Sequence, residues 1–135
     1  MAIPRFWREI SSRYNLYGSR CESCGTLDFP PRTVCPMCGR KSVGRMERVK
    51  LNGKGTVVSY SVIHDAPAQY EMMKPYVLAI VEMEEGCRLT SQVIDVDPAQ
   101  VKIGMQVEAA FRKLGQEGES GIIHYGYKFR PATQA

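Results

Sequence analysis

The spacing of apolar residues changes character once along this chain, near residue 43. Between Pro4 and Tyr17, Phe6, Ile10 and Tyr14 recur at intervals of four residues, and Trp7 lies beside them. Side chains four apart share one face of an α-helix, so the pattern predicts an amphipathic helix within residues 1–17. Its apolar stripe could pack on the rest of the chain. Because aromatic residues beside arginines are typical of interface hot spots, we also expect Phe6, Trp7 and Ile10 to contact a partner.

From Val43 onward the apolar residues follow a period of two, which predicts β-strands. Asn52-Gly53 separates the runs 43–51 and 54–63, and this dipeptide is typical of a tight hairpin turn. The run 76–83 is almost wholly apolar, as in a strand that is buried on both faces. Asp97-Pro98 predicts one short helical turn, with the aspartate as its N-cap.

The last run, residues 122–130, places four bulky residues on one face and three basic residues on the other. The first set is Ile123, Tyr125, Tyr127 and Phe129, and the second is His124, Lys128 and Arg130. Altogether the pattern gives five or six short strands without a long helix among them. This number fits a small closed barrel, of which the OB-fold is the commonest form. We therefore expect a mainly β chain with a barrel over residues 45–135.

Four cysteines stand in two matching C-x-x-C-G frames, at positions 21, 24, 35 and 38, and ten residues separate the frames. This spacing is typical of a zinc ribbon, in which Cys21, Cys24, Cys35 and Cys38 would bind one tetrahedral Zn²⁺. We place the ribbon at residues 18–44. Four thiolates fill the coordination shell, so the metal would be structural and would leave no position for substrate. A rubredoxin-type iron centre has the same ligands and stays open as an alternative.

The fifth cysteine, Cys87, follows a predicted turn and has no histidine near it in the sequence, so we interpret it as a packing residue. The chain has 135 residues and a net charge of +4, a mild excess that permits an anionic partner without requiring one. No apolar leader begins the chain and no apolar run is long enough to span a membrane. Together with reduced thiolates, this predicts a cytoplasmic protein.

The sequence contains neither a nucleophile elbow nor paired carboxylates, and its two histidines are isolated from each other. An enzyme that uses His64 or Cys87 remains a weak alternative, because nothing near either residue would activate it. The long connection 65–75 offers a different role. Its adjacent Met72 and Met73 suit an adaptable contact surface, and we expect them to meet a partner.

The aromatic motif Phe6-Trp7, both cysteine frames, Phe29-Pro30-Pro31-Arg32 and the strand that begins Pro75-Tyr76-Val77 occur here in a fixed order. In these motifs the chain resembles a family in which a rubredoxin-like zinc ribbon precedes an OB-fold, and the resemblance covers nearly the whole chain. Members of that family accompany thiolases and other acyl-CoA enzymes. The resemblance is strongest to a small third subunit of the archaeal assembly of acetoacetyl-CoA thiolase and 3-hydroxy-3-methylglutaryl-CoA synthase.

This resemblance implies a non-catalytic scaffold that bridges the two enzymes in the mevalonate pathway of isoprenoid biosynthesis and helps to form a site for CoA or acyl-CoA. On this hypothesis we assign CoA contacts to Arg32, Tyr70 and Lys74. The alternative function is binding of single-stranded nucleic acid, which both OB-folds and zinc ribbons perform. The modest charge disfavours that alternative, and so does the placement of Tyr125, Tyr127 and Phe129 on one face, which suggests a core position.

Overall fold

Most of the chain forms a five-stranded barrel closed in the order β4-β5-β6-β8-β7, with β7 returning to β4. The computed structural model describes residues 3–116 and 118–132. Neighbouring strands are antiparallel except β6 and β8, which run parallel. This is the strand order expected of an OB-fold. The strands are β4 (Lys54–Ile63), β5 (Tyr76–Met83), β6 (Arg88–Val93), β7 (Gln106–Gln116) and β8 (Ile123–Pro131).

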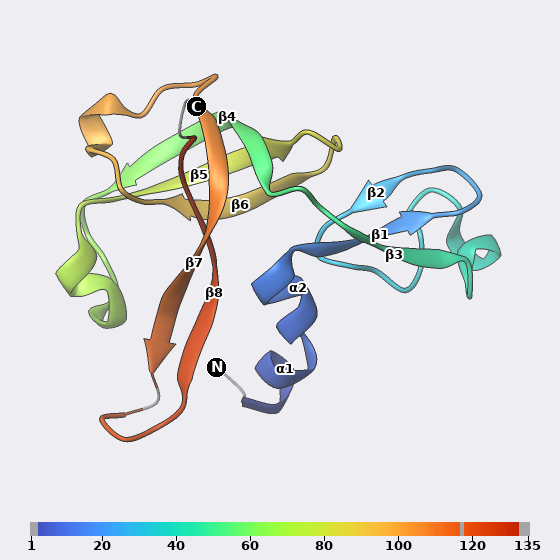
Figure 1. The fold of residues 1–135 in the computed structure, drawn as a ribbon, viewed down its shortest axis with the longest axis horizontal. Helices are drawn as coiled ribbons and strands as arrows, with labels where there is room; N and C mark the ends of the chain where they lie inside the picture. The colour runs from blue at the N-terminus through green and yellow to red at the C-terminus, as the bar shows by residue number, and fades with distance from the viewer. Residues whose placement is uncertain (1–2, 117, 133–135) are drawn as a thin grey trace.

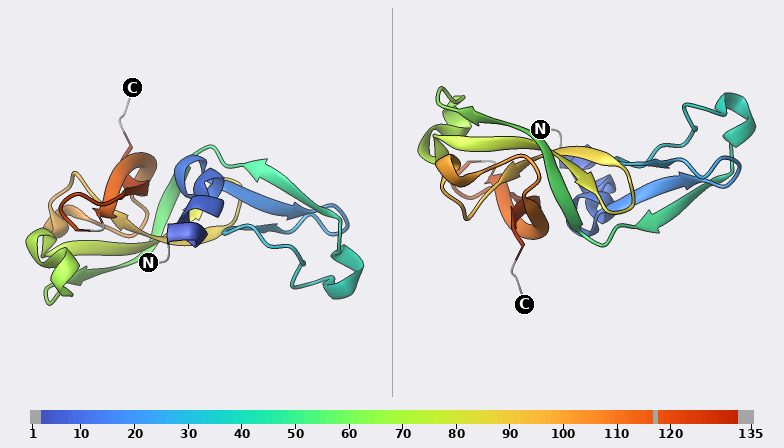
Figure 2. Two further views of the ribbon diagram at one scale, coloured as in Figure 1. Left: turned by 90° about the horizontal axis from the view of Figure 1, so that it is seen from below. Right: turned by 90° about the horizontal axis from the view of Figure 1, so that it is seen from above.

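A second sheet of three strands lies at the other end of the molecule's long axis (Figure 1). Its order is β2-β1-β3, with β1 (Tyr17–Cys21) in the centre between β2 (Leu27–Asp28) and β3 (Met46–Lys50). Figure 2 shows this sheet projecting away from the barrel in both views. Three short 3₁₀ turns complete the fold: η1 (Gly39–Ser42), η2 (Ala68–Met73) and η3 (Pro98–Gln100). The predicted N-cap of η3 is confirmed, since Asp97 Oδ1 accepts a hydrogen bond from the Ala99 amide at 3.0 Å.

The predicted N-terminal helix is present as two short helices rather than one. α1 (Ile3–Arg8) and α2 (Ile10–Asn15) are separated at Glu9, and α2 ends where Leu16 adopts the left-handed conformation, with φ of 54°. Both helices lie between the β7–β8 hairpin and the small sheet (Figure 1). No helix within residues 3–116 and 118–132 combines the length and the apolar character needed to cross a membrane.

The hairpin predicted at Asn52-Gly53 is wrong. β3 pairs with β1 across the small sheet, whereas β4 pairs with β5 and β7 in the barrel. Gly53 does have the positive φ of 80° that a turn glycine supplies, but here it turns the chain from one sheet into the next. The small sheet consequently extends to Lys50, six residues past the boundary that we expected at residue 44.

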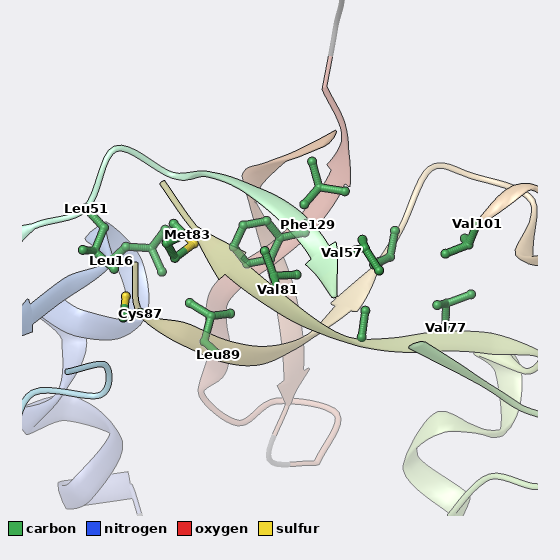
Figure 3. Packing of buried hydrophobic residues seen from close by; sticks show 13 residues of the cluster. Leu16, Leu51, Val57, Val77, Val81, Met83, Cys87, Leu89, Val101 and Phe129 are labelled. Atoms are coloured by element: carbon green, nitrogen blue, oxygen red, sulfur yellow. The ribbon is translucent and has the colours of Figure 1, made fainter. Parts of the chain in front are cut away.

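The barrel interior is a continuous apolar cluster (Figure 3). Phe129 is its largest fully buried side chain. Leu16 and Leu51, which flank the small sheet in sequence, are buried in the same cluster, so the two sheets share one core. The other members are Val57, Val77, Ala79, Val81, Met83, Cys87, Leu89, Val93, Val101 and Val107.

Two expected faces differ in the structure. β5 buries alternate residues only, so that Leu78 and Ile80 remain exposed and the strand is not covered on both sides. In β8, His124 and Lys128 are buried rather than solvated. The ring of His124 packs against Phe6 of α1 at a centroid distance of 4.5 Å. The helices therefore cover part of the β8 face that carries the basic residues.

Candidate functional site

The four cysteines of the two C-x-x-C frames converge at the far end of the small sheet. Their sulfur atoms all lie within 4.8 Å of one another. Cys21 Sγ is 3.9 Å from Cys38 Sγ, and Cys24 Sγ is 3.5 Å from Cys35 Sγ. Zn–S bonds of about 2.3 Å in a tetrahedron require sulfur atoms about 3.8 Å apart. The donor set and its spacing thus fit one tetrahedral zinc ion with no open position.

The two knuckle turns are built alike. The amides of Gly25 and Gly39 donate to the carbonyls of Cys21 and Cys35 at 2.8 and 2.9 Å. Both glycines have positive φ, which a residue with a Cβ adopts at a cost. This is the reason for the glycine that closes each C-x-x-C-G frame.

A buried serine supports the second knuckle. The Ser42 hydroxyl accepts a hydrogen bond from the Cys35 amide at 2.7 Å and donates one to the Gly39 carbonyl at 2.7 Å. Both contacts hold the turn that presents Cys35 and Cys38. No sequence motif marks this serine, because its role depends on η1 folding back over the knuckle.

The ionisation of the cysteines is uneven before a metal is considered. A hydrogen bond with the Thr26 hydroxyl, at 3.1 Å, lowers the pKa of Cys24 to about 6. A hydrogen bond with Cys24 raises the pKa of Cys38 to about 12. Zinc binds cysteine as the thiolate, so metal binding must release the proton that Cys38 holds in the free site.

The residues that we expected at a partner interface fall into two groups. Trp7 of α1 is 71% exposed and Met72 of η2 is 98% exposed, while Met73 is also exposed. Phe6, in contrast, is only 4% exposed and has Arg13 over its ring at 4.6 Å, while Ile10 is half-buried. Phe6 is thus used inside the chain, where it orients α1, and Trp7 is the aromatic side chain that α1 offers to solvent.

The three residues assigned to CoA have different immediate neighbours. Arg32 lies beside Asp28, with Nε 3.9 Å from Oδ1, and the Lys74 ammonium pairs with Glu71. Tyr70 lies against Tyr76 at a centroid distance of 5.8 Å and lines a cleft with a volume of about 510 Å³. Neither Arg32 nor Lys74 lines that cleft.

Sequence analysis did not identify one exposed apolar group on the ribbon. Met37, between the cysteines of the second frame, is 77% exposed, and Val34 and Val43 on either side are exposed as well. A methionine inside a C-x-x-C frame has no periodicity to reveal it, so its exposure appears only in the folded knuckle.

The alternative functions find little support in the geometry. Burial, with a smaller contribution from Glu85, raises the pKa of Cys87, which is the opposite of an activated thiol. Tyr127 packs on Phe29 at 5.5 Å, and Phe129 is fully buried. The buried Phe129 ring therefore cannot serve as a platform for bases, while Tyr127 is partly covered by Phe29.

Comparison with known proteins gives matches to both parts of the chain. Residues 8–44 match the family described as ChsH2, rubredoxin-like zinc ribbon domain, and residues 48–112 match ChsH2, C-terminal OB-fold domain. A DUF35 domain-containing scaffold protein of Methanocaldococcus jannaschii is 53% identical over 96% of this chain and 90% of its own length. A benzoylsuccinyl-CoA thiolase subunit of Thauera aromatica is 30% identical over 85% of this chain and 75% of its own.

A solved structure shows the same architecture. One chain of the complex described as Ltp2-ChsH2(DUF35) aldolase superposes with a TM-score of 0.73 at 35% identity, covering 96% of this chain and 94% of that one. The likeness includes both the small sheet and the barrel.

Proposed function

This chain belongs to the DUF35 family of scaffold proteins, in which a ChsH2-type zinc ribbon precedes an OB-fold, and on that premise we propose that it is a non-catalytic subunit of a thiolase assembly. More specifically, it would hold acetoacetyl-CoA thiolase against 3-hydroxy-3-methylglutaryl-CoA synthase in the cytoplasm. The relative that is a thiolase subunit and the relative found with an aldolase support an acyl-CoA context for this proposal.

The observation that carries the proposal is the position of the exposed apolar residues. Met37 and Val43 belong to the ribbon, whereas Met72 and Met73 belong to η2 of the barrel. The ribbon and η2 lie at opposite ends of the long axis (Figure 1). Exposed apolar side chains at two separated ends suit simultaneous contact with two proteins, and Trp7 of α1 lies on an element between those ends.

The benefit of such a bridge is kinetic and thermodynamic. Condensation of two acetyl-CoA molecules is unfavourable, and a synthase held nearby would consume acetoacetyl-CoA at high effective concentration. This would draw the first reaction forward in the mevalonate pathway. The role requires a rigid spacer more than a catalytic group, which agrees with the closed metal site and the shared core.

The proposal also includes a direct contact between this chain and CoA. Tyr70 is the assigned residue whose position supports it best, because it lines the 510 Å³ cleft. Arg32 and Lys74 already have carboxylate neighbours. In the assembly they would have to exchange these carboxylates for CoA phosphates.

The test is gentle purification of the tagged chain from its own cells, with co-eluting proteins identified by mass spectrometry. We expect thiolase and synthase in stoichiometric amounts. Met37→Ala and Met72→Ala should each weaken retention of a different enzyme, since these residues lie in parts at opposite ends of the chain. Ile103→Ala is the matched control, because Ile103 is 70% exposed in the loop that follows η3.

Two outcomes would contradict the bridge. The first is a chain that elutes alone or with nucleic acid. The second is retention of both enzymes when Trp7, Met37 and Met72 are all replaced by alanine in one variant that still binds zinc.

A further inference from the structure

One basic residue of the barrel is enclosed without a partner. Lys128 of β8 is 7% exposed. No hydrogen bond or ion pair to its ammonium occurs in the described part of the chain, and no buried acid compensates it. The charged group that influences it is Arg112, which has the same sign. The side chain is mostly buried, but its ammonium still reaches the cleft described below, where an anion supplied from outside can pair with it.

Lys128 lines the same cleft as Tyr70, between α2, the ribbon and the outer surface of the barrel. Aromatic and aliphatic side chains form most of the walls, and the cleft volume of about 510 Å³ lies within the range of small-molecule sites, about 300–1,000 Å³. The principal apolar lining residues are Phe29, Tyr70, Tyr76, Leu78, Leu114 and Tyr127.

The charges of the lining favour a single negative group. Arg13 also borders the cleft, but its guanidinium is engaged by Glu9, with Nη2 3.0 Å from Oε2. That pair is internally neutral, so Lys128 supplies the net charge of the lining. One ammonium matches one carboxylate, and the hydroxyl group of Ser91 stands in the same lining to donate a hydrogen bond.

We propose that this cleft binds a small organic acid with an apolar body, whose carboxylate is neutralised by Lys128. The apolar body lies along the aromatic walls. The site is separate from the surfaces at Met37 and Met72 and from the phosphate contacts assigned to Arg32 and Lys74, but it shares Tyr70 with the proposed CoA contact. It therefore stands or falls independently of the bridging function.

The experiment compares two ligands that differ only in charge, hexanoate and 1-hexanol, on the zinc-loaded full chain. Amide shifts in two-dimensional NMR report where each binds and how tightly. We expect hexanoate to shift amides of β6 and β8 around Ser91 and Lys128 in a saturable manner. It should bind about tenfold more tightly than 1-hexanol, the scale of one hydrogen bond to a charged group.

Lys128→Met keeps most of the side-chain volume and removes the charge, so it should abolish the preference for hexanoate over 1-hexanol. Lys128→Arg retains the charge and should retain the preference. Lys102→Met is the matched control at an exposed lysine outside the cleft, and it should change neither affinity by more than about twofold.

The proposal is overturned if hexanoate leaves the cleft amides unshifted, or if the two ligands bind equally to the unmodified chain. It is also overturned if Lys128→Met keeps the preference. A parallel titration with CoA separates the two ideas, because CoA shifts confined to Arg32 and Lys74, with hexanoate shifts at Ser91 and Lys128, would support two separate sites.

Discussion

The ribbon and the barrel are ordered by different forces. The barrel encloses the apolar cluster around Phe129, whereas the interior of the ribbon consists largely of Cys21, Cys35 and Ser42. At about 25 cal/mol per Å² of buried apolar surface, a fold needs such a cluster to offset its conformational entropy. The barrel has one, and the ribbon has a metal site in its place.

The ribbon and the barrel should therefore be destabilised by different changes. In a module of this kind the free energy of metal binding is also the free energy of folding. The barrel, in contrast, should tolerate loss of the metal and fail when its packing is disturbed.

Removal of the metal should produce the largest effect. Chelation, or Cys35→Ser, is expected to unfold residues 17–50 and to leave the strands from β4 onward in place, because structural zinc contributes about 10–16 kcal/mol in such modules. Amide NMR spectra with and without zinc would show which signals collapse. Cys87→Ala is the control, since Cys87 is in the barrel core and should leave zinc stoichiometry unchanged. Simultaneous loss of the barrel signals would contradict the separation.

Phe129→Ala tests the opposite side of the comparison. Truncation of this fully buried ring should cost about 3–5 kcal/mol of unfolding free energy. Urea unfolding followed by circular dichroism would measure the loss, and native mass spectrometry should still find one zinc per chain. Phe111→Ala, at a half-exposed ring, should cost far less. If both variants lost the same free energy of unfolding, burial of Phe129 would not be the main source of the barrel's stability.

Ser42→Ala should weaken the ribbon without touching a ligand. Its hydroxyl bridges the Cys35 amide and the Gly39 carbonyl. Loss of groups that orient ligands typically lowers metal affinity about 10- to 100-fold. Competition with a zinc-sensitive dye would measure this change, and Ser23→Ala on the exposed first knuckle serves as the control. Zinc affinity within twofold of the unmodified chain would remove Ser42 from this role.

Lys128→Met should have the smallest effect, and one that depends on pH. Burial, together with the nearby Arg112, lowers the pKa of Lys128 below its ordinary 10.5. Between the folded and unfolded pKa values the unfolded chain binds more protons, so this group makes stability rise with pH. The variant has no buried charge, so its free energy of unfolding should exceed that of the unmodified chain by up to about 1 kcal/mol at pH 7. The difference should shrink toward pH 10. Urea unfolding at both pH values would check it, and a constant difference would contradict the lowered pKa.

The metal centre and the barrel could be predicted from the sequence because both depend on local physical signals. Two C-x-x-C-G frames fix ligand type, turn geometry and spacing within a few residues. Asp97 caps η3 through its own neighbour. The pairing of β3 with β1 was not predicted, because the turn residues at Gly53 indicate that the chain bends there but not which strands pair on either side.

The cleft was missed for a related reason. A period of two separates the faces of β8 but does not say what covers each face. His124 and Lys128 are buried because α1 and α2 return across the hairpin, a contact between residues more than a hundred positions apart. Likewise, the apolar run of β5 suggested burial on both faces, yet Leu78 borders an open cleft.

The ribbon joins the barrel at Leu16 and Leu51, and this junction bears on how the ribbon can vary. The chain leaves the barrel core at Leu16 and re-enters it at Leu51, and the Leu51 amide donates to the Leu16 carbonyl at 3.0 Å. The ribbon is thus an excursion whose two ends meet at one hydrogen bond. In evolutionary terms we expect the tip of the ribbon to vary more freely than Leu27 and Phe29, because these two side chains pack against the barrel core.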